Sequence, residues 1–290
     1  NFMIIWLASY PKSGNTLVRS LLSAYFFTED GKFKFEQLKN IIQFPNVHLF
    51  KSYGIDINND REVVKNYINI QKNINKDNNN SLKFIKTHSA PYTIDGHKFT
   101  DLQNTLGAIY IVRDPRNLVC SFSNHYSLSL ERSVDSLTSF STLGGNLDSS
   151  LKADQIVTHL GSWASHYNAW KEFKKIDKFF LIKYEDLLSN TDKIFLNVLE
   201  HIHNLKNLKF EINEKKFKNS IETTDFEKLK SIENEQGFPE SIKINQNENI
   251  NFFHEGPKRN WKKDLPKNIK EKIEKEFTNE MLELGYLVKN

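Results

Sequence analysis

A short polar run between two apolar segments carries the residue types of an anion-binding loop. Residues 10–16 read YPKSGNT, and an apolar run, 2–8, precedes them. Apolar residues recur at helical spacing over 17–25, so the order is strand, loop, helix. Backbone N–H groups and the positive end of the helix dipole point at such a loop. The run adds a positive charge, hydroxyl donors and a glycine that lets a phosphate approach the backbone: Lys12, Ser13, Gly14, Asn15 and Thr16.

The position of the lysine distinguishes this run from the common P-loop. That loop has two glycines separated by four residues, and its lysine follows the second glycine. Here Lys12 precedes Gly14, the only glycine of the run. A kinase-like phosphotransferase that binds a triphosphate with magnesium is therefore less favoured, and an ordinary turn with an exposed lysine is the structural alternative.

A second candidate anion site follows another apolar run, 106–112. Arg113 stands at the end of this run, and a helix that contains Ser121 is expected over 117–126. Asp114 is suited to cap that helix. The planar guanidinium of an arginine holds a phosphate through paired hydrogen bonds. Two separate anion sites suit a nucleotide that carries phosphates at both ends.

One histidine occupies a position that favours catalysis. His88 directly follows a short predicted strand, 82–87, and Lys86 lies near the end of that strand. An unperturbed pKa of about 6.5 lets a histidine accept a hydroxyl proton near neutral pH. Most histidines in a chain are structural, but the strand-end position and the neighbouring lysine favour a general-base role for His88.

Four predicted strands must position these side chains. They cover 2–8, 82–87, 106–112 and 179–184, and they alternate with helices. The alternation predicts an α/β fold in which a central parallel sheet is flanked by helices and ligands bind at the carboxyl ends of the strands. No internal repeat or Pro/Gly-rich linker is visible, so a single domain over 1–290 is expected.

Further segments surround this frame. Amphipathic helices are predicted over 161–175 and 266–284, and both apolar stripes are expected to be core. Residues 69–80 are rich in asparagine and lysine and are interpreted as a solvated insertion. Residues 131–153 and 236–253 are interpreted as loops.

Composition excludes several classes of protein. Lysine plus arginine exceed aspartate plus glutamate by only 40 − 36 = 4, which does not predict a nucleic-acid partner. The single cysteine, Cys120, excludes an intramolecular disulfide and an all-cysteine zinc site, and no carboxylate cluster suggests a metal. No apolar stretch approaches the roughly 20 residues of a membrane helix, and residues 1–9 lack the features of a signal peptide. We expect a cytoplasmic protein with no membrane, metal or nucleic-acid partner.

Several of these motifs, in this order, resemble those of the sulfotransferases that use 3′-phosphoadenosine 5′-phosphosulfate (PAPS). The run at 10–16 is similar to the family's YPKSGTTW, with Asn15 in place of threonine and Leu17 in place of tryptophan. The RDPR run at 113–116 and the KTH run at 86–88 are also similar to family signatures. The resemblance implies the P-loop-like nucleotide-binding fold of this family, with PAPS as cosubstrate and no metal.

The resemblance also implies roles for individual residues. Arg113 and Ser121 would bind the 3′-phosphate, Thr224 and Phe226 would lie near the adenine, and the family's catalytic base falls on His88. The cofactor site that the resemblance implies comprises Lys12, Ser13, Gly14, Asn15, Thr16, Leu17, Arg113, Ser121, Tyr184, Thr224, Phe226, Gly256 and Arg259.

The chain departs from the family most clearly near its C-terminus. The family signature RKGxxGDWK corresponds here to HEGPKRNWK at 254–262. Glu255 replaces a lysine and would repel a phosphate if it pointed inward. One hypothesis is that Lys258 or Arg259 supplies the missing charge from a neighbouring position. The central pair of the family's short dimerisation signature is also missing, so no oligomeric state is predicted.

The expected reaction moves a sulfuryl group from PAPS to a hydroxyl, or less often an amine, of a small acceptor. His88 would take the acceptor proton, and Lys12, with Lys86 as second choice, would stabilise the leaving oxygen. The alternative is a module that binds PAPS or its product, 3′-phosphoadenosine 5′-phosphate (PAP), but has lost catalysis. The sequence does not identify the acceptor, although aromatic residues of the expected pocket segments are compatible with a hydrophobic one: Phe44, Phe50, Phe140 and Phe238.

Overall fold

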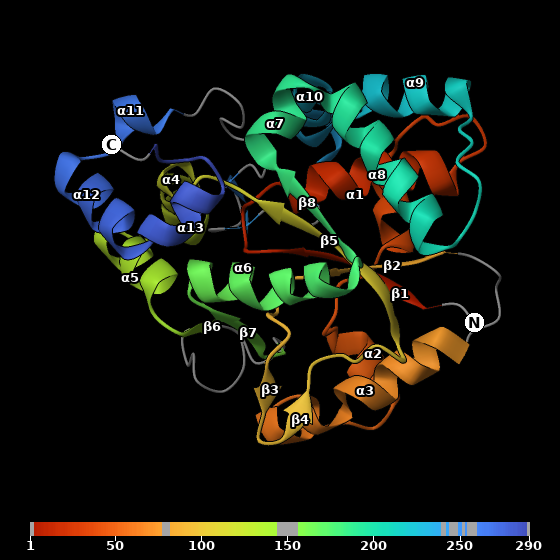
Figure 1. The fold of residues 1–290 in the computed structure, drawn as a ribbon, viewed down its shortest axis with the longest axis horizontal. Coiled ribbons are helices and arrows are strands. Elements are labelled where there is room, and N and C mark those ends of the chain that lie inside the picture. The colour runs from red at the N-terminus through yellow and green to blue at the C-terminus, as the bar shows by residue number, and fades with distance from the viewer. Residues whose placement is uncertain are drawn as a thin grey trace.

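A four-stranded parallel sheet with helices on both faces forms the centre of the computed structural model (Figure 1). The structure describes residues 3–76, 82–143, 156–238, 242–243, 249–250, 253 and 260–288. The strand order is β2-β1-β5-β8, and each neighbouring pair is parallel. The strands are β1 (Ile4–Ser9), β2 (Lys83–Thr87), β5 (Thr105–Val112) and β8 (Phe179–Lys183). The predicted fold class, a central parallel sheet flanked by helices, is confirmed.

Alternate residues of β1 pack on opposite faces of the sheet. Ile4, Trp6 and Ala8 belong to one buried cluster, which we call the Trp6 cluster. Ile5 and Leu7 belong to another, which we call the Ile5 cluster. Both faces of the strand are covered, and this explains why its sequence is apolar throughout.

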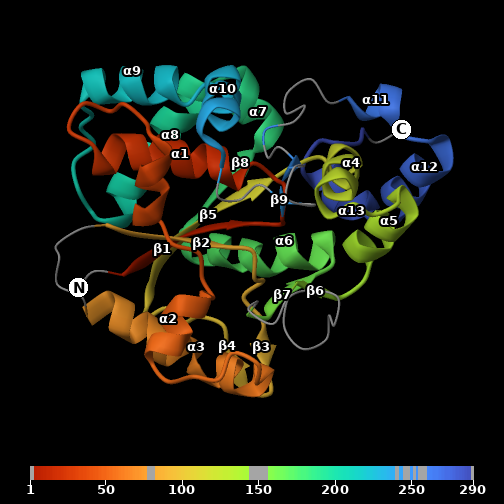
Figure 2. The same cartoon turned by 180° about the vertical axis from the view of Figure 1, so that it is seen from behind.

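The Ile5 cluster lies under helices from distant parts of the chain. Figures 1 and 2 show these helices together on one side of the sheet. Each contributes apolar side chains to the cluster. They are α1 (Asn15–Phe27), α7 (Tyr184–Ser189), α8 (Thr191–Leu205), α9 (Glu214–Thr223) and α10 (Phe226–Gln236), with the short 3-10 helix η1 (Phe35–Asn40) beside α1.

The Trp6 cluster is covered by helices on the other side of the sheet. Their apolar side chains complete the larger of the two buried cores. They are α2 (Val47–Ser52), α3 (Asp60–Lys76), α4 (Pro115–Tyr126), α5 (Leu130–Thr138), α6 (Trp163–Lys171), α12 (Lys267–Glu276) and α13 (Thr278–Glu283). The shorter elements are η2 (Glu172–Ile176), α11 (Trp261–Asp264) and the antiparallel pairs β3 (Thr93–Ile94) with β4 (His97–Lys98), β6 (Ser141–Leu143) with β7 (Thr158–Gly161), and β9 (Ile242–Lys243) with β10 (Asn249–Ile250).

Three predictions about individual segments are wrong. Much of 69–80 belongs to α3, whose buried Ile70 and Gln71 lie in a segment interpreted as solvated. The loop expected over 131–153 contains most of α5, which buries Val134 and Leu137 in spite of its serines. The helix expected over 266–284 is two helices that meet at Phe277, although its apolar stripe is buried as predicted.

The strand order reverses beside β1, and this reversal positions the candidate site. The chain passes from β1 to β2 on one side and then crosses to β5 on the other side of β1. In open parallel sheets, ligands bind in the crevice at the carboxyl ends of strands where the order reverses. The loops that leave β1 and β5 at this edge carry Lys12 and Arg113. Over the residues described, no helix combines the length and apolar character needed to cross a bilayer.

Candidate functional site

The loop between β1 and α1 makes a sharp turn at the N-terminus of the helix. Lys12 has a φ of 67° and Gly14 a φ of 100°, both in the left-handed region. Gly14 is the N-cap of α1 and has no side chain to satisfy the first helical N–H groups. A helix N-terminus without a capping side chain leaves these donors and the positive end of the dipole to an anion.

The ring of Tyr184 joins this loop to the end of β5. A Cβ atom on Gly14 would clash with Cδ2 of Tyr184, so the close approach itself requires glycine. The guanidinium of Arg113 lies over the same ring, 4.7 Å from its centre. Nη1 of Arg113 also donates a hydrogen bond to the carbonyl oxygen of Lys12 at 3.1 Å. The two predicted anion sites are therefore in direct contact.

Several buried polar atoms at this edge have unmet hydrogen-bonding capacity, and one of them is Oδ1 of Asn15, an acceptor. The hydroxyl oxygen of Ser13 and Nε of Arg113 are buried and have no partner among the residues described. The two residues are only 1% and 6% exposed. Buried polar groups are normally paired, and an anion bound at this edge would supply acceptors for the Ser13 hydroxyl and for Nε of Arg113. The residues present thus fit a phosphate-bearing nucleotide.

Asn15 and Leu17 point into the protein. Nδ2 of Asn15 donates to the carbonyl oxygen of Leu7 at 2.9 Å and to Oγ of Ser9 at 3.1 Å. Leu17 is 7% exposed and packs in the Ile5 cluster. Asn15 therefore ties the start of α1 to β1, and its contribution to an anion site would come from its backbone. Thr16 is also buried at the start of α1.

His88 lies at the end of β2, at the same edge of the sheet. Its Nδ1 lies 2.8 Å from the carbonyl oxygen of Ser9 and 3.3 Å from the hydroxyl of Ser9. A carbonyl oxygen only accepts, so Nδ1 carries the proton of this hydrogen bond. In the neutral ring the lone pair is then on Nε2. This tautomer is the one that a general base needs when its other nitrogen is held by the protein.

A buried histidine supports the backbone of His88 from α6. Nε2 of His166 donates to the carbonyl oxygen of His88 at 3.0 Å, and Nδ1 of His166 accepts from the hydroxyl of Tyr110 at 2.8 Å. Complete burial lowers the pKa of His166 to about 4, against the opposing effect of the hydrogen bond to His88. His166 is therefore neutral at physiological pH. Nε1 of Trp170 holds the next carbonyl oxygen, that of Ser89, at 3.0 Å.

The predicted lysines approach the site from two elements. Lys86 is paired with Leu7 in the register of β2 and β1, which puts its buried side chain on the α1 face of the sheet. Nζ of Lys12 lies 3.4 Å from Nδ1 of His125 on α4. Ser121 precedes His125 by one helical turn and shares its face of α4. The predicted phosphate-binding face of α4 therefore looks toward the Lys12 loop.

The remaining predicted cofactor residues lie in other parts of the chain. Thr224 is buried at the end of α9, where its hydroxyl donates to the carbonyl oxygen of Ser220 at 2.7 Å. The ring of Phe226, at the start of α10, packs edge-on against the ring of Phe253, with 5.8 Å between the ring centres. Gly256 and Arg259, like the rest of 254–259, lie outside the described residues. Within the described ranges, no group of three or more histidine, cysteine or carboxylate side chains could hold a metal ion.

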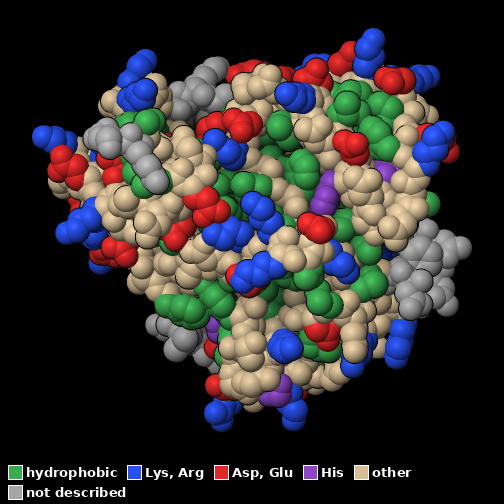
Figure 3. Space-filling view, viewed as in Figure 1, with side chains coloured by type: hydrophobic (Ala, Val, Ile, Leu, Met, Phe, Trp, Pro, Cys, Tyr) green, Lys and Arg blue, Asp and Glu red, His purple; other side chains and the backbone are tan. Residues whose placement is uncertain are grey.

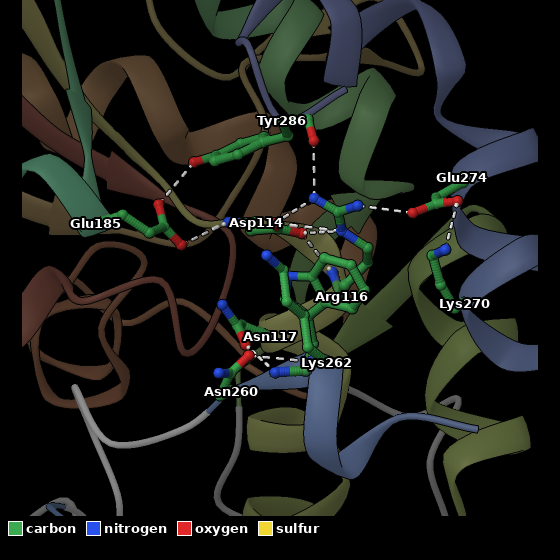
Figure 4. Close-up of polar contacts among 10 residues, drawn as sticks. Asp114, Arg116, Asn117, Glu185, Asn260, Lys262, Lys270, Glu274 and Tyr286 are labelled. Atoms are coloured by element: carbon green, nitrogen blue, oxygen red, sulfur yellow. Dashed lines mark hydrogen bonds and ion pairs between the residues drawn. The ribbon is translucent and has the colours of Figure 1, made fainter. Parts of the chain in front are cut away.

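The second arginine of the RDPR run is a structural residue. Arg116 forms ion pairs with Asp114 at 2.7 Å and with Glu274 of α12 at 2.6 Å, and it donates to the carbonyl oxygen of Tyr286 at 2.8 Å (Figure 4). Its guanidinium lies 4.0 Å from the centre of the Trp261 ring. We call these side chains the Arg116 network. It fixes the C-terminal helices to the start of α4.

Glu185 extends this network toward Tyr184. Its carboxylate accepts from the backbone N–H of Asp114 at 3.0 Å and from the hydroxyl of Tyr286 at 2.9 Å. Burial raises the pKa of Glu185 despite these two hydrogen bonds. The residue next to Tyr184 in the chain therefore holds the turn between Arg113 and α4 in place. Glu185 therefore supports both the Tyr184 side of the anion site and the C-terminal segment that contains Tyr286.

The sequence did not reveal His125 or the positioning role of His166. The contact of His166 with His88 joins residues 78 positions apart. His125 falls one turn after Ser121 on the predicted helix, and that spacing was the one available signal. Three of the four aromatic residues expected around the acceptor are buried: Phe44 and Phe50 lie in the Trp6 cluster and Phe238 in the Ile5 cluster, whereas Phe140 is 65% exposed.

The surface gives no sign of a continuous basic patch on the face seen in Figure 3. Lysine and arginine side chains are interspersed with aspartate and glutamate there. Charges of both signs screen one another at such a surface. This agrees with the small formal charge of +4.

Comparisons with known proteins agree on the nature of this fold. A family model described as a sulfotransferase domain matches residues 4–285. A curated human protein, Sulfotransferase 1E1, is 24% identical over 280 residues, which span 96% of this chain and 83% of that protein. The structure of mouse sulfotransferase SULT7A1 complexed with PAP matches with a TM-score of 0.57 and 17% identity, and covers 96% of this chain and 84% of that one. Retinol dehydratase in complex with androsterone and the inactive cofactor PAP matches with a TM-score of 0.58 and 14% identity, over 96% and 80% of the two chains.

Proposed function

The chain belongs to the sulfotransferase family, and from this membership we propose that it moves the sulfuryl group of PAPS to a hydroxyl, or an amine, of a small acceptor. The observation that carries the proposal is the pair of unpartnered buried atoms, Oγ of Ser13 and Nε of Arg113, at the edge where the strand order reverses. An anionic ligand with groups for two sites would supply partners for both atoms at this edge. The two structural neighbours crystallised with PAP support the same ligand.

In this proposal the chain's residues divide the chemistry between them. Nε2 of His88 takes the proton of the acceptor hydroxyl while the acceptor oxygen bonds to sulfur. The bond between sulfur and the bridging oxygen breaks, and its electron pair stays on the oxygen of the departing PAP. The ammonium of Lys12 stabilises the charge that develops there, with Lys86 as second candidate. Arg113 and Ser121 bind the 3′-phosphate, and the other predicted cofactor residues complete the site.

The position of His88 favours catalysis over simple nucleotide binding. A binding module has no need for a histidine whose tautomer is fixed by a carbonyl oxygen and whose backbone is held by a second, buried histidine. The kinase-like alternative receives no support from the family match. A cytoplasmic location, suggested by the single cysteine, stays part of the proposal.

The test combines labelled PAPS with a panel of alcohols, phenols, steroids and amines. We expect the wild-type chain to sulfate at least one acceptor, and His88→Ala to bind PAP normally by calorimetry but to turn over about 10²–10⁴ times more slowly. His203→Ala is the matched control, because His203 lies at the end of α8. Normal PAP binding without sulfation of any acceptor would favour the binding module. Normal turnover in His88→Ala would remove His88 from the mechanism.

A further inference from the structure

The candidate base is held by Ser9, the last residue of β1. Nδ1 of His88 lies 2.8 Å from the carbonyl oxygen of Ser9 and 3.3 Å from its hydroxyl oxygen. One residue therefore offers two oxygens to the ring nitrogen that does not take the acceptor proton. Ser9 is fully buried, and its backbone is paired with Ile111 of β5, so both oxygens have a defined position.

The hydroxyl of Ser9 is held in turn by Asn15, the first residue of α1. Nδ2 of Asn15 donates to Oγ of Ser9 at 3.1 Å and to the carbonyl oxygen of Leu7 at 2.9 Å. A carbonyl oxygen only accepts, so the amide nitrogen must face Leu7, and both of its hydrogens are used. Oδ1, the other polar atom of this side chain, is an acceptor and offers nothing to a phosphate oxygen. The side chain of Asn15 is therefore suited to hold β1, not to bind a nucleotide.

The hydrogen bonds form a chain from α1 to the imidazole ring, through Asn15, Ser9 and His88. When Nε2 of His88 takes a proton, the ring becomes a cation while the hydrogen on Nδ1 stays in place. Hydrogen bonds from a charged donor are stronger than those from a neutral one. The two oxygens of Ser9 therefore stabilise His88 more after the proton transfer than before it, and Asn15 holds the hydroxyl where it can contribute.

A second buried serine shows what a merely structural hydroxyl looks like. Ser20, on α1, is fully buried as Ser9 is, and its hydroxyl donates to the carbonyl oxygen of Thr16 at 2.9 Å. Such a bond satisfies a hydroxyl within its own helix. The hydroxyl of Ser9 instead lies between side chains from two other parts of the chain, α1 and the end of β2.

We propose that Ser9 and Asn15 are positioning residues for the sulfuryl transfer. The carbonyl oxygen of Ser9 fixes the tautomer of His88, its hydroxyl helps to orient the ring, and Asn15 fixes the hydroxyl. No proton passes along the chain, because the acceptor proton stays on Nε2. The effect on the reaction rests on the proposed function, whereas the hold on His88 does not. Since α1 also presents the predicted phosphate site, Asn15 joins the nucleotide loop to the base.

Turnover and nucleotide affinity should respond differently to substitution. Ser9→Ala removes the hydroxyl and keeps the carbonyl oxygen, and Asn15→Ala removes both donors to β1. Each should lower kcat with labelled PAPS about 3- to 10-fold, for the acceptor that the wild-type chain sulfates fastest. The dissociation constant of PAP, measured by calorimetry, should change by less than about threefold. Ser9→Thr keeps the hydroxyl and should keep kcat within about twofold of the wild type.

NMR of the imidazole groups reports the hold on His88 without any acceptor. Correlations between ring protons and ring nitrogens show which nitrogen carries the proton in the ¹⁵N-labelled chain with PAP bound, and His88→Ala assigns the signals. We expect neutral His88 to carry its proton on Nδ1. In Ser9→Ala and Asn15→Ala this proton should exchange with water about threefold faster or more, because one of its acceptors is removed or no longer held.

Ser20→Ala is the matched control, since it removes another fully buried serine hydroxyl, and we expect it to behave as the wild type in both measurements. If Ser9→Ala and Asn15→Ala keep the wild-type kcat, or lose PAP affinity as strongly as turnover, the positioning roles fail and the proposed function stands. If the wild type sulfates no acceptor, the proposed function fails, and faster exchange in both variants still establishes the hold on His88. A wild-type His88 that carries its proton on Nε2 would overturn the proposal in either case.

Discussion

Two arginines three residues apart differ in how far their hydrogen-bonding capacity is met. Arg116 has two carboxylates, a carbonyl oxygen and an aromatic ring around its guanidinium (Figure 4). Arg113 has the carbonyl oxygen of Lys12 and the ring of Tyr184, and its buried Nε has no partner among the residues described. Both are buried to a similar degree.

The difference distinguishes an arginine that stabilises the fold, Arg116, from one that has a donor left for a ligand, Arg113. A buried guanidinium that is fully paired contributes to the fold, since removing it leaves its carboxylates unpaired. A buried guanidinium with an unmet donor is costly until a ligand supplies the missing acceptor. Two histidines differ in exposure, because His166 is enclosed with both ring nitrogens paired, whereas His88 is partly exposed at the sheet edge. Substitutions in the two regions should therefore affect different quantities.

The largest effect is expected for Arg116→Ala. The variant leaves the carboxylates of Asp114 and Glu274 without their main partner and removes the anchor of the C-terminal helices. Breaking a buried ion pair on one side costs about 3–5 kcal/mol, so the free energy of unfolding should fall by about that amount. Urea unfolding followed by tryptophan fluorescence measures it.

Arg61→Ala is the control for Arg116→Ala. Its ion pair with Asp95 is exposed, and such pairs contribute little to stability. The free energy of unfolding of this variant should therefore stay close to that of the wild type. If Arg116→Ala is no less stable than Arg61→Ala, the Arg116 network does not support the fold, and the contrast between the two arginines is lost.

A smaller effect on stability is expected from pH, through His166. Its folded pKa is about 4, below the ordinary value of 6.5, so the neutral ring is favoured in the folded state. The stabilisation of the folded state by neutral His166 is complete above pH 6.5. As the pH falls toward 4, the free energy of unfolding decreases by about 3 kcal/mol in total. His166→Gln keeps a donor and an acceptor but does not titrate. The free energy of unfolding of this variant should fall less steeply between pH 6.5 and 4 than that of the wild type.

His203→Gln shows whether this pH effect is specific to His166. It removes a histidine from the last turn of α8, outside the contacts of His88. We expect this variant to lose stability as steeply as the wild type over the same pH range. Parallel pH profiles for the wild type and His166→Gln would mean that His166 is not held neutral by the fold.

The sequence predicted the sheet and the edge of the sheet that carries the candidate site. Buried parallel strands read as short apolar runs, so β1, β2, β5 and β8 were predicted within one or two residues of their observed ends. Because the carboxyl ends of parallel strands share one edge, Lys12, His88 and Arg113 were predicted to lie close together.

Features that depend on contacts between distant segments were not predictable in this way. The Arg116 network joins α4 to Glu274, and the support of His88 comes from α6. Neither contact has a local signature. Helix α5 was missed for a local reason, because its serines suggested a loop while Val134 and Leu137 supply the buried stripe. Residues 254–259, where the sequence departs most from the family, are not described by the structure and stay a prediction.

The smallest effect on stability and the clearest effect on binding are expected for Arg113→Ala. The variant removes one hydrogen bond, to the carbonyl oxygen of Lys12, together with a buried donor that lacks a partner. These two changes oppose each other, so the free energy of unfolding without nucleotide should change by less than about 1 kcal/mol.

The dissociation constant of PAP should rise about 10- to 100-fold, because charge-assisted hydrogen bonds to a phosphate are lost. Arg113→Lys keeps the charge without the planar fork. Its dissociation constant for PAP should lie between those of the wild type and Arg113→Ala. Calorimetric titration of PAP and urea unfolding measure the two quantities separately. If Arg113→Ala destabilises the chain as much as Arg116→Ala and binds PAP normally, then the unmet donor at Arg113 does not mark a ligand site.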